Sequence, residues 1–342
     1  MKIWFDILTP KQVLFFEPMI KQLQKSNEVF CTARNYREVT ELAKIRKMKL
    51  VFIGKHGGSL KADKLNASLN RTALLTSRIQ QFKPDLTISF CSPEASRVSF
   101  GLGIRHIAFC DSPHAEAVMR LSIPLIQKLL IPWIIPKKEF AKYGINSKDI
   151  IQYKAIDASV IIRYNDYNIS TVPKKKKNIL IRLEEEHAAY MKKNRHSTLT
   201  IVQEIIKRFG NHSVMILPRY HDQIATLKRM VGNKAKILDQ VMDSKTLLQE
   251  TDIFVGSGGT MTAESALLGI PTISYNAVPN LVEKYLVRKK LAIRETNPKR
   301  IVSVIEKILI SDNVHFRNNA RAAMDAMDDP VKKLGQIIKM KD

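Results

Sequence analysis

The feature of this sequence that most constrains its fold is a repeated alternation of short apolar runs with amphipathic stretches. The runs are rich in β-branched and aromatic residues, which is typical of strands buried on both faces of a parallel sheet. The stretches between them space their apolar residues as helices do. Repeated strand–helix–strand order predicts an α/β protein built from right-handed crossovers, with doubly wound sheets.

The alternation divides into two halves. The strands predicted in the first half are 2–8, 28–34, 49–54, 86–90, 105–111 and 129–135, and those in the second are 178–184, 213–219, 234–239, 252–257 and 271–276. Between them the pattern breaks at DYNISTVPKKKK, residues 166–177, a polar segment with a proline and four lysines. We interpret this segment as a linker between two domains, 1–165 and 178–310, followed by terminal helices in 311–342.

The charge balance is strongly basic. The 342 residues include 56 Lys and Arg against 32 Asp and Glu, a formal net charge of +24. Such a field attracts nucleic acid, anionic lipid headgroups or phosphorylated ligands. The lysines are spread over predicted helices and loops alike, without a compact basic motif interleaved with aromatics, which argues against a nucleic-acid partner. A generally basic soluble protein remains the alternative.

Cysteine usage and hydropathy bear on location. Cys31, Cys91 and Cys110 are scattered without a CxxC pair, which argues against a disulfide framework or zinc site and suits a reducing cytoplasm. No uncharged apolar stretch reaches the roughly 18 residues of a spanning helix. The beginning, MKIWFDILTPK, carries an acid and a proline where a signal peptide needs an apolar run. We therefore expect a cytoplasmic protein.

The segment VGSGGTMTAESALLGIPTISY, residues 255–275, is the strongest candidate ligand site. Ligands of open α/β sheets bind beyond the carboxyl ends of the strands. Here Ser257, Gly258, Gly259 and Thr260 follow a strand and open a helix, so that backbone N–H groups and the positive helix end can hold a phosphate. Glu264 lies one turn after Thr260 on the same helix face, where a carboxylate can accept hydrogen bonds from a ribose diol. The alternative is a glycine turn that caps the helix, with a solvated glutamate.

A second candidate site follows the strand at 105–111. Asp111, His114 and Glu116 gather polar groups suited to general acid–base work, and a carboxylate neighbour can poise a histidine near neutral pH. No H-x-x-x-H spacing accompanies them, so no metal site is predicted. A structural histidine is the alternative.

Two other loops of the first half also follow strands. Thr9 is expected to cap the helix after the first strand and Lys11 to face the interdomain cleft, where both would contact substrate, with helix capping alone as the alternative for Thr9. No G-x-G-x-x-G occurs there, which argues against dinucleotide binding by this loop. The loop after the third strand is interpreted as a tight substrate-binding loop or a simple turn, and its candidate residues are Lys55, His56, Gly57 and Gly58.

Two arginines end strands of the second half. Arg182 and Arg219 are candidates for contact with a ligand, with solvated strand ends as the alternative. No Walker sequence and no serine-elbow motif appear in the chain.

The glycine loop and the two α/β halves together resemble the GT-B glycosyltransferase architecture. That resemblance implies two Rossmann-like domains facing a cleft, an N-terminal acceptor domain, a nucleotide-sugar domain over 178–310 and a C-terminal helix crossing back to the first domain. Ser257, Gly258 and Gly259 would seat the diphosphate, and Glu264, seven residues after Ser257 as in the peptidoglycan N-acetylglucosaminyltransferases, would hold the ribose.

Five segments resemble a more specific family. DILTPKQVLFFEPMI, IGKHGG, SPEASRVSFGLGI, FCDSPHA and SGGTMTAESALLGIPTISY are similar to the mostly archaeal domain of unknown function 354 family over nearly the whole chain. HAEAVMR, residues 114–120, also resembles the H-V-E-A-G-x-R segment of UDP-N-acetylglucosamine 2-epimerases, which implies a catalytic Glu116. The CSPE and IRLEEEH stretches depart from the epimerase pattern, as does the spacing from Ser257 to Glu264.

These resemblances imply a metal-independent glycosyltransferase with a nucleoside-diphosphate sugar, in the first place a UDP-sugar, as donor and no tightly bound cofactor. His114 or Glu116, with Asp111, would carry out acid–base chemistry. The basic charge suits a glycan, lipid-linked or other anionic acceptor and association with the inner face of the membrane. A sugar-nucleotide epimerase or hydrolase and a non-catalytic basic binding protein are the alternatives.

Overall fold

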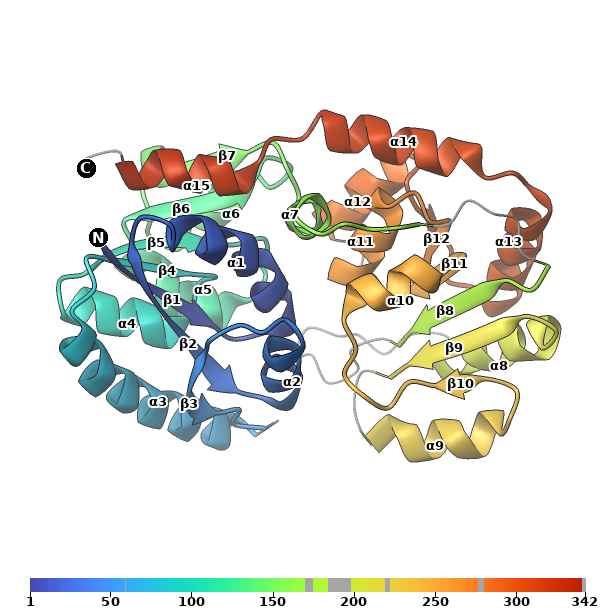
Figure 1. The fold of residues 1–342 in the computed structure, drawn as a ribbon, viewed down its shortest axis with the longest axis horizontal. Helices are drawn as coiled ribbons and strands as arrows, with labels where there is room; N and C mark the ends of the chain where they lie inside the picture. Colours follow the sequence, from blue (N-terminus) through green and yellow to red (C-terminus); the bar gives the residue numbers. More distant parts are fainter. Residues whose placement is uncertain (59, 170–174, 184–197, 219–221, 276–279, 340–342) are drawn as a thin grey trace. The chain divides into compact units, whose positions relative to one another are not determined.

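The computed structural model describes residues 1–342 except 59, 170–174, 184–197, 219–221, 276–279 and 340–342 (Figure 1). The chain forms two compact units, unit 1 comprising Met1–Val160 with Asp328–Asp342, and unit 2 comprising Ile161–Met327. The division falls inside helix α7, Asp157–Arg163, ahead of the segment interpreted as a linker. Helix α14, Val314–Asp325, belongs to unit 2, and the chain rejoins unit 1 at Asp328.

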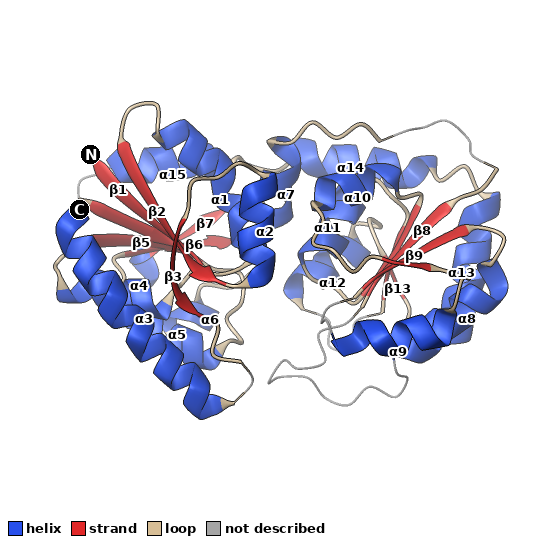
Figure 2. Cartoon of the chain, turned by 60° about the horizontal axis from the view of Figure 1, so that its bottom comes forward, coloured by secondary structure: helices blue, strands red, loops and turns tan. Residues whose placement is uncertain are grey.

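Unit 1 is a seven-stranded parallel sheet in the order β3-β2-β1-β4-β5-β6-β7. Its strands are β1 Lys2–Ile7, β2 Glu28–Asn35, β3 Val51–Lys55, β4 Leu86–Ser89, β5 Arg105–Phe109, β6 Lys128–Pro132 and β7 Ile150–Tyr153. The helices that belong wholly to it are α1 Pro10–Leu23, α2 Arg37–Ile45, α3 Lys61–Phe82, α4 Pro93–Gly101, α5 Glu116–Ser122, α6 Lys138–Ala141 and α15 Pro330–Lys339. Helices cover both faces of each sheet (Figure 2), so β4, in the middle of the unit 1 sheet, is buried at every residue.

Unit 2 is a six-stranded parallel sheet in the order β10-β9-β8-β11-β12-β13. Its strands are β8 Asn178–Arg182, β9 Ser213–Leu217, β10 Lys236–Ile237, β11 Ile253–Gly256, β12 Thr272–Ser274 and β13 Ile293–Arg294. Its other helices are α8 Thr198–Phe209, α9 Asp222–Val231, α10 Ser244–Glu250, α11 Thr260–Leu267, α12 Leu281–Arg288 and α13 Pro298–Ile310.

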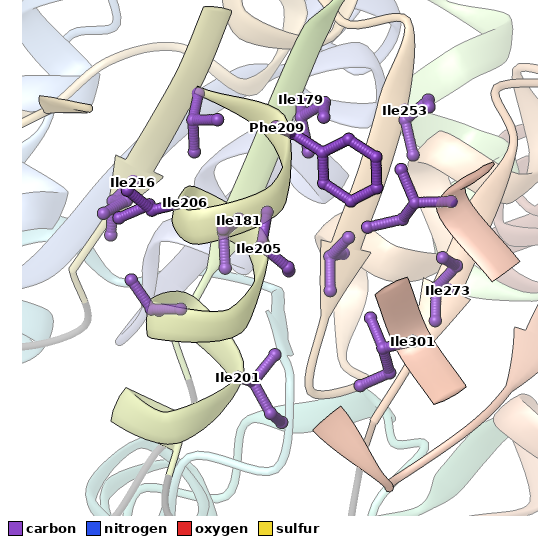
Figure 3. Packing of buried hydrophobic residues seen from close by; sticks show 14 of the residues in the cluster. Ile179, Ile181, Ile201, Ile205, Ile206, Phe209, Ile216, Ile253, Ile273 and Ile301 are labelled. Carbon is purple, nitrogen blue, oxygen red and sulfur yellow. The ribbon is translucent and has the colours of Figure 1, made fainter. Parts of the chain in front are cut away.

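Isoleucines dominate one core layer of unit 2 (Figure 3). Strand residues such as Ile179 and Ile253 pack with Ile205 of α8 and Ile301 of α13, and all four are nearly or wholly buried. β-Branched side chains suit the pleated sheet, and the helical spacing of the others brings them onto the same layer.

The α/β fold with two doubly wound sheets is confirmed. Both sheets reverse their strand order beside their first strand, between β1 and β4 in unit 1 and between β8 and β11 in unit 2. In this class of fold a ligand binds at the carboxyl ends of the strands flanking the reversal. The loops after β1 and β11 therefore lie where binding chemistry is expected.

Candidate functional site

The loop between β11 and α11 requires glycine at three positions. Gly258 and Gly259 have φ of 85° and 82°, a region that residues with a side chain rarely adopt. A Cβ added at Gly256, the last residue of β11, would lie 2.5 Å from Cε1 of the buried Phe254 ring and 2.9 Å from the Thr262 hydroxyl oxygen. The glycines therefore set a backbone path that other residues could not follow.

The N-terminus of α11 carries no side-chain cap. Gly259 occupies the cap position without a side chain, and its carbonyl accepts the hydrogen bond from the Ala263 N–H at 3.2 Å. The Thr262 hydroxyl donates to the Gly258 carbonyl at 2.9 Å instead of capping the helix. The positive end of the helix dipole thus meets a partly exposed loop, which is the geometry of an anion site.

Glu264 is buried, with 2% of its surface exposed. Its Oε2 accepts hydrogen bonds from the hydroxyls of Ser244, at 2.7 Å, and Tyr167, at 3.5 Å. The alternative of a solvated glutamate is therefore wrong. The carboxylate is fixed beside the first residue of α10, one turn into α11.

Arg182 connects the carboxyl ends of two strands. Its Nη1 donates to the carbonyl of Pro218, after β9, and Tyr275 donates to the Arg182 carbonyl at 2.8 Å. Arg219, the other predicted arginine, lies outside the described residues.

In unit 1 the structure brings together two predicted residues with one that sequence reasoning missed. The Lys11 ammonium, in the first turn of α1, lies 2.6 Å from Asp111 Oδ2 and 2.7 Å from Asp157 Oδ2. It also lies 4.3 Å from the ring centroid of Phe90. Asp157 begins α7 and accepts a hydrogen bond from the Tyr153 hydroxyl at 2.6 Å.

The two carboxyls of this cluster differ in acidity. Burial alone would raise the pKa of Asp111, but the Lys11 ammonium and its hydrogen bond outweigh burial and lower it. Burial raises the pKa of Asp157 to about 6, and the Asp111 charge adds to the rise, while Lys11 and Tyr153 oppose it only in part. The pair therefore contains one strongly ionised carboxyl and one that titrates near neutrality.

The other two predicted acid–base residues lie on the surface. His114 is exposed in the turn before α5. Glu116 is exposed as well and pairs with Arg120, one turn along α5, at 2.8 Å. Such exposed pairs contribute little to stability.

The remaining predicted residues of unit 1 form local turns. Thr9 occupies the cap position of α1, but its hydroxyl caps no N–H, so the expectation of a side-chain cap at Thr9 was wrong. Its carbonyl accepts from the N–H groups of Gln12 and Val13. Lys55 and His56 are exposed, and Nδ1 of His56 accepts from the Gly58 N–H at 3.1 Å. A Cβ at Gly57 would lie 2.6 Å from the Asp63 carbonyl oxygen, so the loop is tightly closed on α3.

Three comparisons place this geometry among known proteins. The family model described as "Protein of unknown function (DUF354)" matches residues 1–339. The uncharacterized protein MJ0665 of Methanocaldococcus jannaschii is 30% identical over 315 residues, covering 89% of this chain and 90% of that protein. The chain belongs to the DUF354 family. The matched residues include both the glycine loop before α11 and the group formed by Lys11, Asp111 and Asp157.

The fold of this chain is similar to those of solved structures of the GT-B type. UDP-GlcNAc 2-epimerase from Neisseria meningitidis bound to UDP-GlcNAc matches with a TM-score of 0.73 at 15% identity, over 99% of both chains. S. aureus MnaA with UDP matches with a TM-score of 0.72 at 13% identity, over 99% of this chain and 96% of that one. Spinosyn rhamnosyltransferase SpnG with thymidine diphosphate matches with a TM-score of 0.65 at 12% identity, over 99% and 100%.

The described residues contain neither a group suited to a metal ion nor a helix suited to crossing a membrane. Outside the undescribed segments, no group of three His, Cys, Asp or Glu could hold a metal ion. Among the helices the structure describes, none is long and apolar enough to cross a bilayer.

Proposed function

We propose that this protein transfers a sugar from a nucleoside-diphosphate sugar to an acceptor hydroxyl. The observation that carries the proposal is the α11 N-terminus, left uncapped behind two glycines at the strand reversal of unit 2. Backbone N–H groups and the helix dipole there stabilise the diphosphate as it leaves with its added charge. Ser257 and Thr260 add hydroxyls at the same loop.

Glu264 is proposed to orient the ribose. In the present conformation its Oε2 is held by Ser244 and Tyr167, so a ribose hydroxyl would exchange with the Ser244 hydroxyl as donor to that oxygen. Arg182 and Arg219 are proposed to contact the donor as well, since Arg182 ends β8 and Arg219 comes after β9 in the sequence.

Unit 1 is proposed to bind the acceptor and to supply the acid–base residue. The candidates are Asp111, His114 and Glu116, with Thr9, Lys11 and the 55–58 loop as acceptor contacts. Asp111 is supported best, because it alone of the three has a described ion pair with a partly buried lysine. Positioning and electrostatic stabilisation would supply most of the remaining rate.

The acceptor is proposed to be an anionic or lipid-linked glycan. The net charge of +24 supports this choice, because clustered and dispersed lysines both strengthen binding to an anionic surface. Flotation with vesicles tests this choice of acceptor. The protein is expected to float with anionic phosphatidylglycerol vesicles, and flotation only with neutral phosphatidylcholine vesicles would contradict an electrostatic role.

A sugar-nucleotide 2-epimerase is the second candidate, favoured by the match to the Neisseria meningitidis enzyme and by the position of Glu116 in HAEAVMR. Incubation with UDP-N-acetylglucosamine without acceptor separates the two functions. A transferase is expected to release UDP without acceptor only by slow hydrolysis, because UDP otherwise forms together with the glycosylated acceptor. Accumulation of the 2-epimer would establish the epimerase instead.

A thermal-shift screen with UDP, GDP, TDP and CMP tests the proposal first. A nucleotide that binds only the folded chain raises its melting temperature by mass action. The proposal predicts a rise with at least one of them, and loss of that rise when Gly258→Trp fills the loop. No shift with any nucleotide would contradict it.

A further inference from the structure

The group formed by Lys11, Asp111 and Asp157, called here the lysine cluster, places two carboxyls on one ammonium. Both nitrogen–oxygen distances are short, 2.6 Å and 2.7 Å. When all three groups are ionised the cluster carries a surplus negative charge, which is costly where the groups are largely buried. A shared proton on one of the carboxyls removes that surplus.

The two carboxyls of the lysine cluster face different surroundings. The Asp111 side chain keeps 22% of its surface exposed, and its Oδ1 accepts from the Ser112 hydroxyl at 2.8 Å. The Asp157 side chain keeps only 4%, and the Tyr153 hydroxyl donates to its Oδ1. A substrate can therefore reach Asp111, while Asp157 is almost fully enclosed and meets a substrate proton through the cluster.

The lysine cluster also lies at the edge of the sheet where ligands bind. Lys11 follows β1, Asp111 follows β5 and Asp157 follows β7, so all three stand beyond the carboxyl ends of parallel strands. An ion pair that only joined secondary structure elements would need one carboxylate for one ammonium. The second carboxyl at a ligand-binding edge points to acid–base chemistry.

We propose that Asp111 and Asp157, both ionised on Lys11 at the start of the transfer, take up one proton, share it across the ammonium and so work as the acid–base centre of the reaction. The proposal rests on the transferase function. Asp111 is the catalytic residue and Asp157 the positioning residue behind it. As the acceptor oxygen bonds to the anomeric carbon, its proton passes to the carboxylate pair. The bond from that carbon to the diphosphate oxygen breaks, and its electron pair leaves with the diphosphate.

Three other titratable side chains face the lysine cluster, and a raised pKa keeps two of them neutral. Tyr153 on β7 has its pKa raised by burial and by the Asp157 charge. Cys91, after β4, has its pKa raised by its contact with Cys110, by burial and by Asp111. The third, Cys110, immediately precedes Asp111. The shared proton is therefore assigned to the two carboxyls.

The first test follows the carboxyl carbons of aspartate by ¹³C NMR during a pH titration of the full chain. One carboxyl is expected to titrate near pH 6, to vanish in Asp157→Asn, and to move down by about one pH unit or more in Asp111→Asn, since the neighbouring charge is gone. A matched control is Asp149→Asn, because Asp149 pairs with Lys128 at 2.7 Å with similar exposure. A midpoint for Asp157 below about 5, or one unaffected by Asp111→Asn, would overturn the shared proton.

The second test measures nucleoside diphosphate release against pH. Asp111→Asn is expected to lose at least 100-fold in kcat, about the contribution of a general base. Asp157→Asn lowers kcat and shifts the acid limb of the profile away from pH 6, Asp157→Glu restores the limb, and Asp149→Asn leaves it in place. An acid limb unchanged by Asp157→Asn would overturn the role of Asp157. If the wild type releases no nucleoside diphosphate, the transferase function fails, and with it the acid–base role, whereas the titration still decides the shared proton.

Discussion

The Arg71 guanidinium of α3 is buried against the Asp6 carboxylate of β1. Nη2 lies 2.6 Å from Oδ1 and Nη1 lies 3.1 Å from Oδ2, and at most 1% of either side chain is exposed. Burial would raise the pKa of Asp6, but Arg71, Ser92 and Thr32 together lower it. This pair, with two parallel N–H···O contacts, joins α3, the longest helix of unit 1, to the inner strand β1.

Breaking that pair is expected to destabilise unit 1 strongly. Arg71→Met leaves Asp6 buried without its counter-ion, which costs about 3–5 kcal/mol. Both tryptophans of the chain, Trp4 and Trp133, lie in unit 1, so urea unfolding followed by tryptophan fluorescence reports on that unit. Arg37→Met, which removes an exposed pair with Glu41, is the control and should change stability by less than about 1 kcal/mol. Equal urea midpoints for the two variants would contradict the buried pair.

His106 is expected to make unit 1 less stable in mild acid. Burial lowers its pKa to about 3, and Nε2 lies 2.9 Å from the Ser89 hydroxyl, so the folded state keeps the ring neutral. The unfolded chain binds the proton below pH 6.5, and stability then falls by about 1.4 kcal/mol per pH unit until the folded pKa is reached. His106→Gln should remove this part of the pH dependence, measured from urea midpoints at pH 7 and 5. Equal losses of stability between pH 7 and 5 in the wild type and in His106→Gln would contradict the buried neutral ring.

Asp157 is expected to act with the opposite sign. Because its folded pKa of about 6 lies above the unfolded value, its contribution to stability is complete below pH 4 and is lost as the pH rises through 6. Asp157→Asn should therefore gain about 2–3 kcal/mol relative to the wild type between pH 4 and 7.5. The same fluorescence assay measures the difference at the two pH values. A difference that does not change with pH would show that the carboxyl is not held protonated.

Gly259 is expected to tolerate no side chain even though space is open beside it. A Cβ there would meet no atom within 4 Å, so Gly259→Ala isolates the cost of the backbone at φ 82° and ψ −169°. That cost is about 1–3 kcal/mol. Gly335→Ala, within helix α15, should instead stabilise by about 0.5–1 kcal/mol. Thermal unfolding followed by circular dichroism compares the two, and shifts of the same sign would argue against strain at Gly259.

The apolar runs predict most strands because burial on both faces leaves a continuous apolar signal. The run at 2–8 becomes Lys2–Ile7, and even the acid within it has a physical cause, since Asp6 meets Arg71. The strand Ile293–Arg294 is too short to leave a pattern and was missed. So was Ile150–Tyr153, whose four residues, IIQY, are too few to show a continuous apolar run.

The candidate sites differ in how far sequence predicts them. The glycine loop is formed by residues that are neighbours in the sequence. Two consecutive glycines therefore predict the positive φ found at Gly258 and Gly259. The lysine cluster is tertiary, because the order of β1, β5 and β7 in the sheet decides which carboxyls meet Lys11. For that reason the role of Asp157 left only a weak signal in the sequence. An acid at the start of a helix after an apolar strand is the only hint it offers.

The α11 N-terminus is the centre of the account, and a charge placed there tests it most directly. Thr260→Glu is expected to keep the helix stable, because a carboxylate suits the positive helix end, while it repels a diphosphate. Ser303→Glu, on exposed α13 surface, makes the same change in net charge elsewhere in unit 2.

The deciding measurement is isothermal titration of UDP, GDP, TDP and CMP into the wild type and these two variants. We expect the wild type to bind at least one of them. Thr260→Glu should weaken this binding at least tenfold, about 1.4 kcal/mol, whereas Ser303→Glu should bind with the affinity of the wild type. Glu264→Ala should weaken it as well. No binding by the wild type, or equal affinity for the wild type and Thr260→Glu, would contradict the nucleotide site.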